Sequence, residues 1–153
     1  MKEQLLAAWR INNRMNLLLI DHITDEGMDK TLSPRGRTVY LQFVHMHNVR
    51  LGWLEVASPD IFKKYSPIKK DTRFNRKVLL KGYEDSANGI EELFGKSWDD
   101  GGKIKSFKTG LLPMFGYFVS HESHHRGNIV LTLKQSGEKI PDAVKWGLWK
   151  WEQ

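Results

Sequence analysis

The chain has 153 residues, of which 40% are hydrophobic, 27% are charged and none is cysteine. This composition is typical of one soluble globular domain, and no apolar run approaches the roughly 18 residues that a membrane span requires. The lack of cysteine excludes disulfides, thiolate metal ligands and a catalytic thiol, so any metal must be bound by His, Asp or Glu. The length predicts a single domain over residues 1–153. We expect it to be cytoplasmic, because the N-terminal segment MKEQLLAAWRINNRM lacks the apolar core of a secretory signal.

The formal charge of +6 and the isoelectric point near 9.5 raise the question of nucleic-acid binding. The Lys and Arg residues, however, are scattered in short groups such as RFNRK at 73–77, mostly in or beside the predicted connectors. A solvated surface explains this pattern better than a phosphate-binding face, which would need the basic residues to cluster. We therefore do not expect a nucleic-acid partner.

Four long segments with the apolar spacing of helices follow one another along the chain. The groups DEG at 25–27, LSPRG at 32–36 and ASPD at 57–60 separate the first three. Pro59 prevents continuation of the second helix, Asp71 or Thr72 is a natural N-cap for the third, and Gly137 ends the fourth. The predicted helices cover approximately residues 2–23, 36–56, 71–95 and 109–135.

Four helices of this length in one small domain predict an all-α fold, a four-helix bundle. The connector ASPDIFKKYSPIKK between the second and third helices is longer than an antiparallel hairpin needs. We expect it to be a long crossover that runs the length of the bundle and leaves those two helices parallel. The short C-terminal tail contains Trp146, Trp149 and Trp151, and this much apolar area predicts that the tail packs on the bundle or on a second subunit.

The segment HESHH at 121–125 matches the H-E-x-x-H pattern of zinc proteases. On a helix, residues four apart point the same way, so His121 and His125 can bind one ion, whereas His124 points away. His125 and Glu122 share a face with the apolar residues of this helix. Because unpaired imidazoles in a bundle interior are costly to desolvate, the pair indicates a metal site.

The second helix offers a third ligand in either His45 or His47, which face opposite ways on two apolar stripes. We favour His45, because Gly52 on its stripe would allow a neighbouring backbone to approach closely, and we keep His47 as the alternative. His22, at the end of the first helix, is a weaker candidate, since a lone His at a helix end is more often a surface residue or a cap.

A zinc protease is not expected from the rest of the sequence. Met-turn proteases require H-E-x-x-H-x-x-G-x-x-H, and here Asn128 and Leu131 occupy the Gly and final His positions. The chain also lacks the strands that usually hold a substrate peptide. The histidine pair is therefore predicted to serve a chemistry other than peptide hydrolysis.

Three features together resemble the DinB family, a group of damage-inducible metal-binding bundles within a wider superfamily of bacterial thiol-dependent S-transferases. They are the run HESHHRGN, the His45–Trp53 spacing of the second helix and the tryptophan-rich end WGLWKWE. The resemblance covers most of the chain, with Asn128 where the family usually has Gln. It implies a bundle in which His45, His121 and His125 bind a divalent metal such as zinc or nickel, and it implies frequent homodimers.

Three neutral imidazoles leave at least one coordination position open, which is typical of a working site and not of a closed structural one. A low-molecular-weight thiol at that position would become a nucleophile, which suits a protein with no cysteine of its own. The leading hypothesis is a metal-dependent transferase that joins a thiol cofactor to a small-molecule electrophile in detoxification or stress response.

The alternative hypothesis is a non-catalytic metal-binding or ligand-sensing bundle, which would need the same three histidines. Glu122 has two interpretations of its own. It either orients a ligand His or acts as a catalytic base, or it forms an ion pair with Arg126 or another cation.

Overall fold

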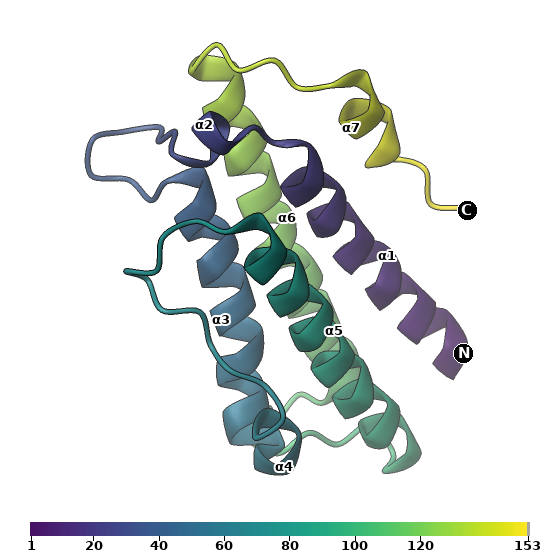
Figure 1. Ribbon diagram of the computed structural model, residues 1–153. Coiled ribbons are helices and arrows are strands. Elements are labelled where there is room, and N and C mark those ends of the chain that lie inside the picture. The colour runs from purple at the N-terminus through teal and green to yellow at the C-terminus, as the bar shows by residue number, and fades with distance from the viewer. Residues whose placement is uncertain (153) are drawn as a thin grey trace.

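The computed structural model describes residues 1–152, and its regular structure is helical (Figure 1). The all-α class predicted from the sequence is confirmed, since extended structure in the described residues is limited to an isolated bridge between Thr31 and Thr38. None of the described helices is long and apolar enough to cross a membrane. The long helices are α1 (Lys2–His22), α3 (Val39–Ala57), α5 (Arg76–Asp99) and α6 (Leu111–Gln135), and the short ones are α2 (Asp25–Met28), α4 (Pro59–Phe62) and α7 (Asp142–Gly147).

The four long helices form the predicted bundle. α1 and α6 run in one direction and α3 and α5 in the other (Figure 1). α5 and α6 each pack against both α1 and α3. The segment 63–75 returns along α3 toward its N-terminal end, so α3 and α5 are parallel (Figure 1). The long crossover is therefore also confirmed.

The crossover is attached to the middle of α3 by polar contacts. The Asn48 side chain donates to the carbonyl oxygen of Ile68 at 2.8 Å and accepts from the backbone N–H of Ile68 at 3.0 Å. His47 is fully buried one residue earlier, with Nε2 3.4 Å from the carbonyl oxygen of Ser66. Because these contacts satisfy backbone groups of an irregular segment, they hold the crossover against the helix.

α5 begins later than the sequence analysis predicts. Its N-cap is Asn75, whose side-chain oxygen accepts a hydrogen bond from the backbone N–H of Val78 at 3.2 Å. Residues 71–75 instead complete the crossover, so the prediction of Asp71 or Thr72 as the cap is wrong. The helix also continues past residue 95 and ends at Asp99.

The connection from α1 to α3 differs from the prediction in two respects. The segment DEG is not simply a break, because Thr24 caps a short helix there, accepting from the backbone N–H of Gly27 at 2.9 Å. α3 begins at Val39 because the hydroxyl of Thr38 accepts from the backbone N–H of Leu41 at 3.2 Å. Side-chain oxygens of threonine therefore define both helix starts.

Glycines with positive φ shape both ends of α6. Gly110 precedes the helix with a φ of 86°, and a Cβ there would lie 2.7 Å from the carbonyl oxygen of Gly102. That oxygen accepts a hydrogen bond from the backbone N–H of Leu111 at 2.8 Å. Gly137 follows the helix with a φ of 76°, as predicted for its C-terminal stop. Glycine adopts such angles without the steric cost that a Cβ brings.

The apolar core is divided into two clusters by a layer of buried polar side chains. One cluster includes Trp9, Leu54 and Phe94, and the other includes Leu19 and Phe43. All four long helices contribute to the polar layer between them. Its members are Asn12, Asn13 and Asn16 of α1, Arg50 of α3, Ser86 of α5, and Glu122 and Arg126 of α6.

The C-terminal tail packs on α1, one of the two placements that the sequence predicts. Val144 of α7 is buried, and a Cβ on Gly147 would lie only 2.6 Å from Leu18 of α1. Trp146 and Trp149 nevertheless remain 68% and 78% exposed. The tail is thus attached through small and aliphatic residues, while much of its indole surface faces outward.

Candidate metal centre

His45 of α3 and His121 and His125 of α6 converge in the structure. Their ligand nitrogens all lie within 4.8 Å of one another, and Nε2 of His45 is 3.3 Å from Nε2 of His121. His125 is buried, whereas the other two rings are half-buried. The geometry follows from one helical turn between the two residues of α6 and from the packing of α3 beside that turn. The cluster could hold a metal ion.

Two neighbours orient the rings. Oε1 of Gln42 lies 3.3 Å from Nδ1 of His125. Since an amide oxygen only accepts, this contact places the hydrogen on Nδ1 and leaves Nε2 with a free lone pair. His121 instead stacks on Tyr117, with ring centroids 5.8 Å apart and planes 10° apart. Gln42 was missed in the sequence, although its position one turn before His45 places both on one face of α3.

The three imidazoles are neutral near pH 7. Burial lowers the pKa of His45 to about 4, and the positive charge of Arg37 acts in the same direction. Burial also lowers the pKa of His125 to about 4, assisted by the other two rings. The pKa of His121 is lowered by burial as well. Protons therefore do not compete with a metal for these nitrogens at neutral pH.

One pair of ligand nitrogens, on His45 and His121, already has the separation that a bound metal ion requires. A tetrahedral zinc ion with bonds of about 2.05 Å separates neighbouring nitrogens by about 3.3 Å. The His45–His121 pair already has this separation, and ligand nitrogens that lie farther apart, within the 4.8 Å limit of the cluster, would have to move closer. Three imidazole donors suit zinc, nickel or copper better than magnesium or calcium.

The remaining histidines lie elsewhere. His47 is fully buried against the crossover and Tyr83, with a centroid distance of 6.2 Å. His124 is exposed, as predicted, and its Nε2 lies 3.0 Å from the Asn128 side-chain amide. His22 is also exposed, with Nδ1 3.0 Å from the backbone of its own helix. The structure thus places His45, and not His47, beside the pair on α6.

The prediction that Gly52 lets a neighbouring backbone approach α3 is wrong, however. Gly52 is exposed, and a Cβ there would meet no described atom within 4 Å. Within residues 1–152, no backbone approaches α3 closely at that position. The choice between two apolar stripes depended on the path of the crossover, which buries His47 and which the helical periodicity alone does not reveal.

Glu122 is fully buried and its carboxylate is occupied by partners from α1 and α3. Arg50 donates to its two oxygens at 2.6 and 2.8 Å, and Asn12 and Asn16 each donate to Oε2 at 2.7 Å. Arg126 lies 3.8 Å away. The pKa of Glu122 is lowered although burial opposes this, because Arg50 stabilises the carboxylate. This geometry favours the ion-pair interpretation, with Arg50 as the main cation.

An aromatic cluster continues the seam between α3 and α6 beyond the histidines. Trp53 lies 5.7 Å from Tyr117 and 5.2 Å from Phe107 between ring centroids. Tyr117, which stacks on His121, is 37% exposed. The histidine cluster therefore has an accessible apolar surface directly beside it.

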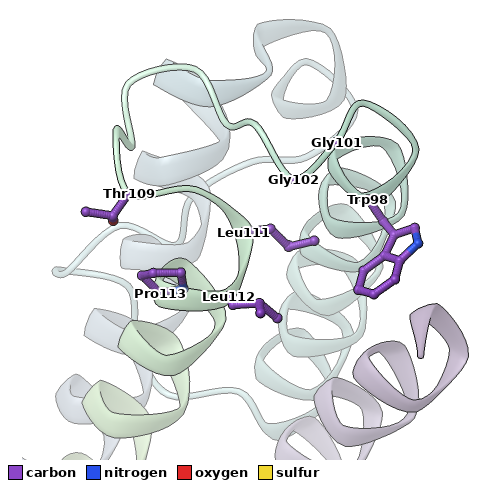
Figure 2. A pocket seen from close by; sticks show the side chains of 7 residues that line it. All are labelled: Trp98, Gly101, Gly102, Thr109, Leu111, Leu112 and Pro113. Atoms are coloured by element: carbon purple, nitrogen blue, oxygen red, sulfur yellow. The ribbon is translucent and has the colours of Figure 1, made fainter.

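A separate cavity of about 500 Å³ lies between the end of α5 and the start of α6 (Figure 2). Trp98 forms one side, and Thr109 and Pro113 lie across from it (Figure 2). Its lining contains no titratable side chain and none of the candidate histidines. This cavity therefore offers no acid–base or metal-binding side chain of its own.

The fold and the site define an α-helical bundle protein with a three-histidine cluster between two neighbouring helices. The sequence model of the DinB family matches residues 1–148. The chain belongs to the DinB family, and the resemblance noted from the sequence is confirmed.

A solved structure shares this fold. The crystal structure of a DinB-like protein from Bacillus cereus ATCC 10987 is 19% identical, covers 91% of this chain and 95% of its own, and has a TM-score of 0.72. A second match is the photosystem I P700 chlorophyll a apoprotein A1 of Chlamydomonas reinhardtii, 26% identical over 105 residues. The matched region covers 68% of this chain but only 14% of that protein, so it carries no functional argument.

Proposed function

We propose that this protein binds a divalent metal ion, zinc or nickel, and acts as a transferase in which a low-molecular-weight thiol attacks a small electrophile. The observation that carries the proposal is the convergence of His45, His121 and His125, three neutral imidazoles from two helices. Three ligands leave a coordination position for an incoming group. The chain has no cysteine, so the thiol must come from solution.

The chain's own residues bind and orient the reacting groups. A divalent ion at this site would supply a Lewis acid that lowers the pKa of a thiol bound at its open position. In such a transfer the thiol would lose its proton to solvent, its sulfur would bond to the electrophilic carbon, and the leaving group would depart with the electron pair of its former bond. Gln42 keeps Nε2 of His125 available, and the exposed ring of Tyr117 offers apolar surface for the electrophile.

The second candidate function is a non-catalytic metal-binding or ligand-sensing bundle. One observation favours it. The hydrogen bonds described for the three rings run between His45 and His121 and from His125 to Gln42, so no described carboxylate is placed on them as a base. Turnover that requires the metal, measured with a panel of thiols and electrophiles, separates the two functions.

The metal assignment is tested by two neighbouring variants. His125→Ala should abolish tight zinc binding and any thiol transfer, while helical circular dichroism stays nearly unchanged because the core does not depend on the ion. His124→Ala is the matched control: it is one residue away but exposed, and metal content should stay close to normal. Metal content and circular dichroism are measured on protein purified without a His tag.

Either of two results would contradict this assignment. Equal metal loss in both variants would mean that the pair four residues apart is not the ligand set. Loss of fold in His125→Ala would make the ion structural, since metal binding would then supply folding energy.

A further inference from the structure

A cavity of about 320 Å³ lies on the side of α6 that faces α1 and the C-terminal tail. Its walls are mainly apolar and include Met15 of α1, Val130 of α6, and Trp149 and Trp151 of the tail. Ser123 and Arg126 are its polar members, and none of the three candidate metal ligands lines it. The cavity is therefore distinct from the candidate metal centre.

Arg126 brings to this cavity a positive charge that the protein neutralises only in part. The side chain is nine-tenths buried and donates to Asn16 at 3.0 Å and to Asn12 at 2.9 Å, both of which are neutral. The carboxylate of Glu122 lies 3.8 Å away, and Arg50 already donates to both of its oxygens. Among the buried side chains described, two guanidinium groups thus share one carboxylate. Such an excess of buried charge is costly unless an anion approaches it.

We propose that this cavity is a binding site for a small aromatic carboxylate, with the carboxylate at Arg126 and the ring against Trp149 and Trp151. A guanidinium group matches the planar, two-oxygen geometry of a carboxylate. The hydroxyl of Ser123 is a further donor on the same wall. An inorganic anion would leave the indole walls in water, and a neutral ring would leave the charge of Arg126 uncompensated.

The size and exposure of the walls agree with this class of ligand. The volume is at the lower end of the range for small-molecule sites and suits a compound of one or two rings. Trp149 is 78% exposed, which is unusual for a large aromatic side chain in a tail that packs on the bundle. A bound ring would cover this surface by stacking.

The test uses the full-length protein and a pair of ligands that differ only in charge. Binding of 1-naphthoate is followed by isothermal titration calorimetry and is compared with that of 1-naphthamide, which has the same rings and no charge. We expect saturable binding of one naphthoate per chain and at least tenfold weaker binding of the amide. A chelator should leave both affinities unchanged, because the cavity shares no residue with the histidine cluster.

Gly127 allows the cavity to be filled without disturbing the buried charges. Gly127 belongs to α6 and lines the cavity, and a Cβ there would meet no described atom within 4 Å. Gly127→Leu should therefore keep the fold and weaken naphthoate binding at least tenfold. Gly116→Leu is the matched control, because Gly116 is an equally open glycine of α6 outside the cavity lining, and it should bind like the wild type. Arg126→Gln, if helical by circular dichroism, should lose the preference for the carboxylate over the amide.

Several results would overturn the proposal. They are the lack of saturable binding, equal affinity for the acid and the amide, and undiminished binding by Gly127→Leu. Analytical ultracentrifugation tests whether this face is instead the interface of a dimer. A wild-type dimer that Gly127→Leu dissociates, with no naphthoate binding, would make this face a subunit interface.

Discussion

Gln42 determines which nitrogen of His125 is available to a metal. Its amide oxygen lies 3.3 Å from Nδ1, so the hydrogen is held there and Nε2 is left to coordinate. Gln42→Leu has a similar volume and removes the acceptor. Because the partner of a ligand histidine typically contributes about 10–100-fold to metal affinity, we expect a loss of that order. A competition titration against a chelating dye measures it.

The control for this prediction keeps an acceptor at the same place. Gln42→Glu should retain zinc affinity, since a carboxylate also accepts from Nδ1–H. If Gln42→Leu binds zinc as tightly as the wild type, the ring is oriented by packing alone.

Arg50 and Glu122 form an ion pair in which neither side chain is exposed. Arg50→Met removes the two short hydrogen bonds to the buried carboxylate of Glu122 and leaves it with the more distant Arg126, 3.8 Å away, so the free energy of unfolding should fall by up to about 3–5 kcal/mol. Glu122→Gln alone should also destabilise, because it leaves the guanidinium without its carboxylate. The double variant should lose less free energy of unfolding than the two single variants lose together. Urea denaturation of the four proteins gives the coupling directly, and strictly additive losses would contradict it.

At the scale of single helices, α3 is buried on three sides by different neighbours. His45 faces α6, His47 faces the crossover, and Arg50 reaches the bundle interior. Helical periodicity assumes one buried stripe, so it could not distinguish His45 from His47. On α6, helical periodicity correctly predicted that His121 and His125 share one face, because their relation depends on a single helical turn.

His47 makes the attachment of the crossover sensitive to acid. Burial lowers the pKa of His47 from 6.5 to about 4 in the folded protein. The unfolded chain therefore binds a proton first as the pH falls, and stability that is complete above pH 6.5 is lost progressively between 6.5 and 4. A pKa difference of this size corresponds to about 3 kcal/mol at most. Urea midpoints at pH 7 and pH 5 measure the effect.

His47→Gln provides the control for that pH dependence. The variant should lose less stability between pH 7 and pH 5 than the wild type, since the contribution of His47 is gone and those of His45, His121 and His125 remain. An unchanged difference between the two pH values would exclude His47 as the titrating group.

Helix ends were predicted correctly where a Pro or Gly fixes the backbone conformation. They were missed where several residues could serve as the N-cap. Pro59 prevents α3 from continuing and Gly137 ends α6, and the structure shows both helix ends. The predicted caps for α5 were Asp71 and Thr72, whereas the observed cap is Asn75, a residue type that caps equally well. Residues 71–75 belong to the crossover in the structure, and local sequence does not reveal where an irregular segment ends and a helix begins.

At the scale of the molecule, the bundle and its parallel pair of helices followed from apolar spacing and the length of one connector. The polar layer did not, because Asn12, Asn13 and Asn16 are ordinary surface residue types and become buried only when four helices meet. The same holds for Arg50, whose partner lies 72 residues away in the chain. Contacts of this kind depend on tertiary packing and leave no local pattern in the sequence.

The histidine cluster joins two helices that the chain itself connects only by a long path, since His45 and His121 are 76 residues apart. A metal bound to both would be a removable cross-link between α3 and α6 that leaves α1 and α5 unlinked. Amide hydrogens around residues 42–49 and 118–128 should then exchange with deuterium more slowly in the zinc-loaded protein, while those in the first turns of α1 keep their rates. Mass spectrometry of the two forms reads this out. Equally slowed amide exchange in all four helices would mean that the ion stabilises the whole bundle and does not act only as a cross-link between α3 and α6.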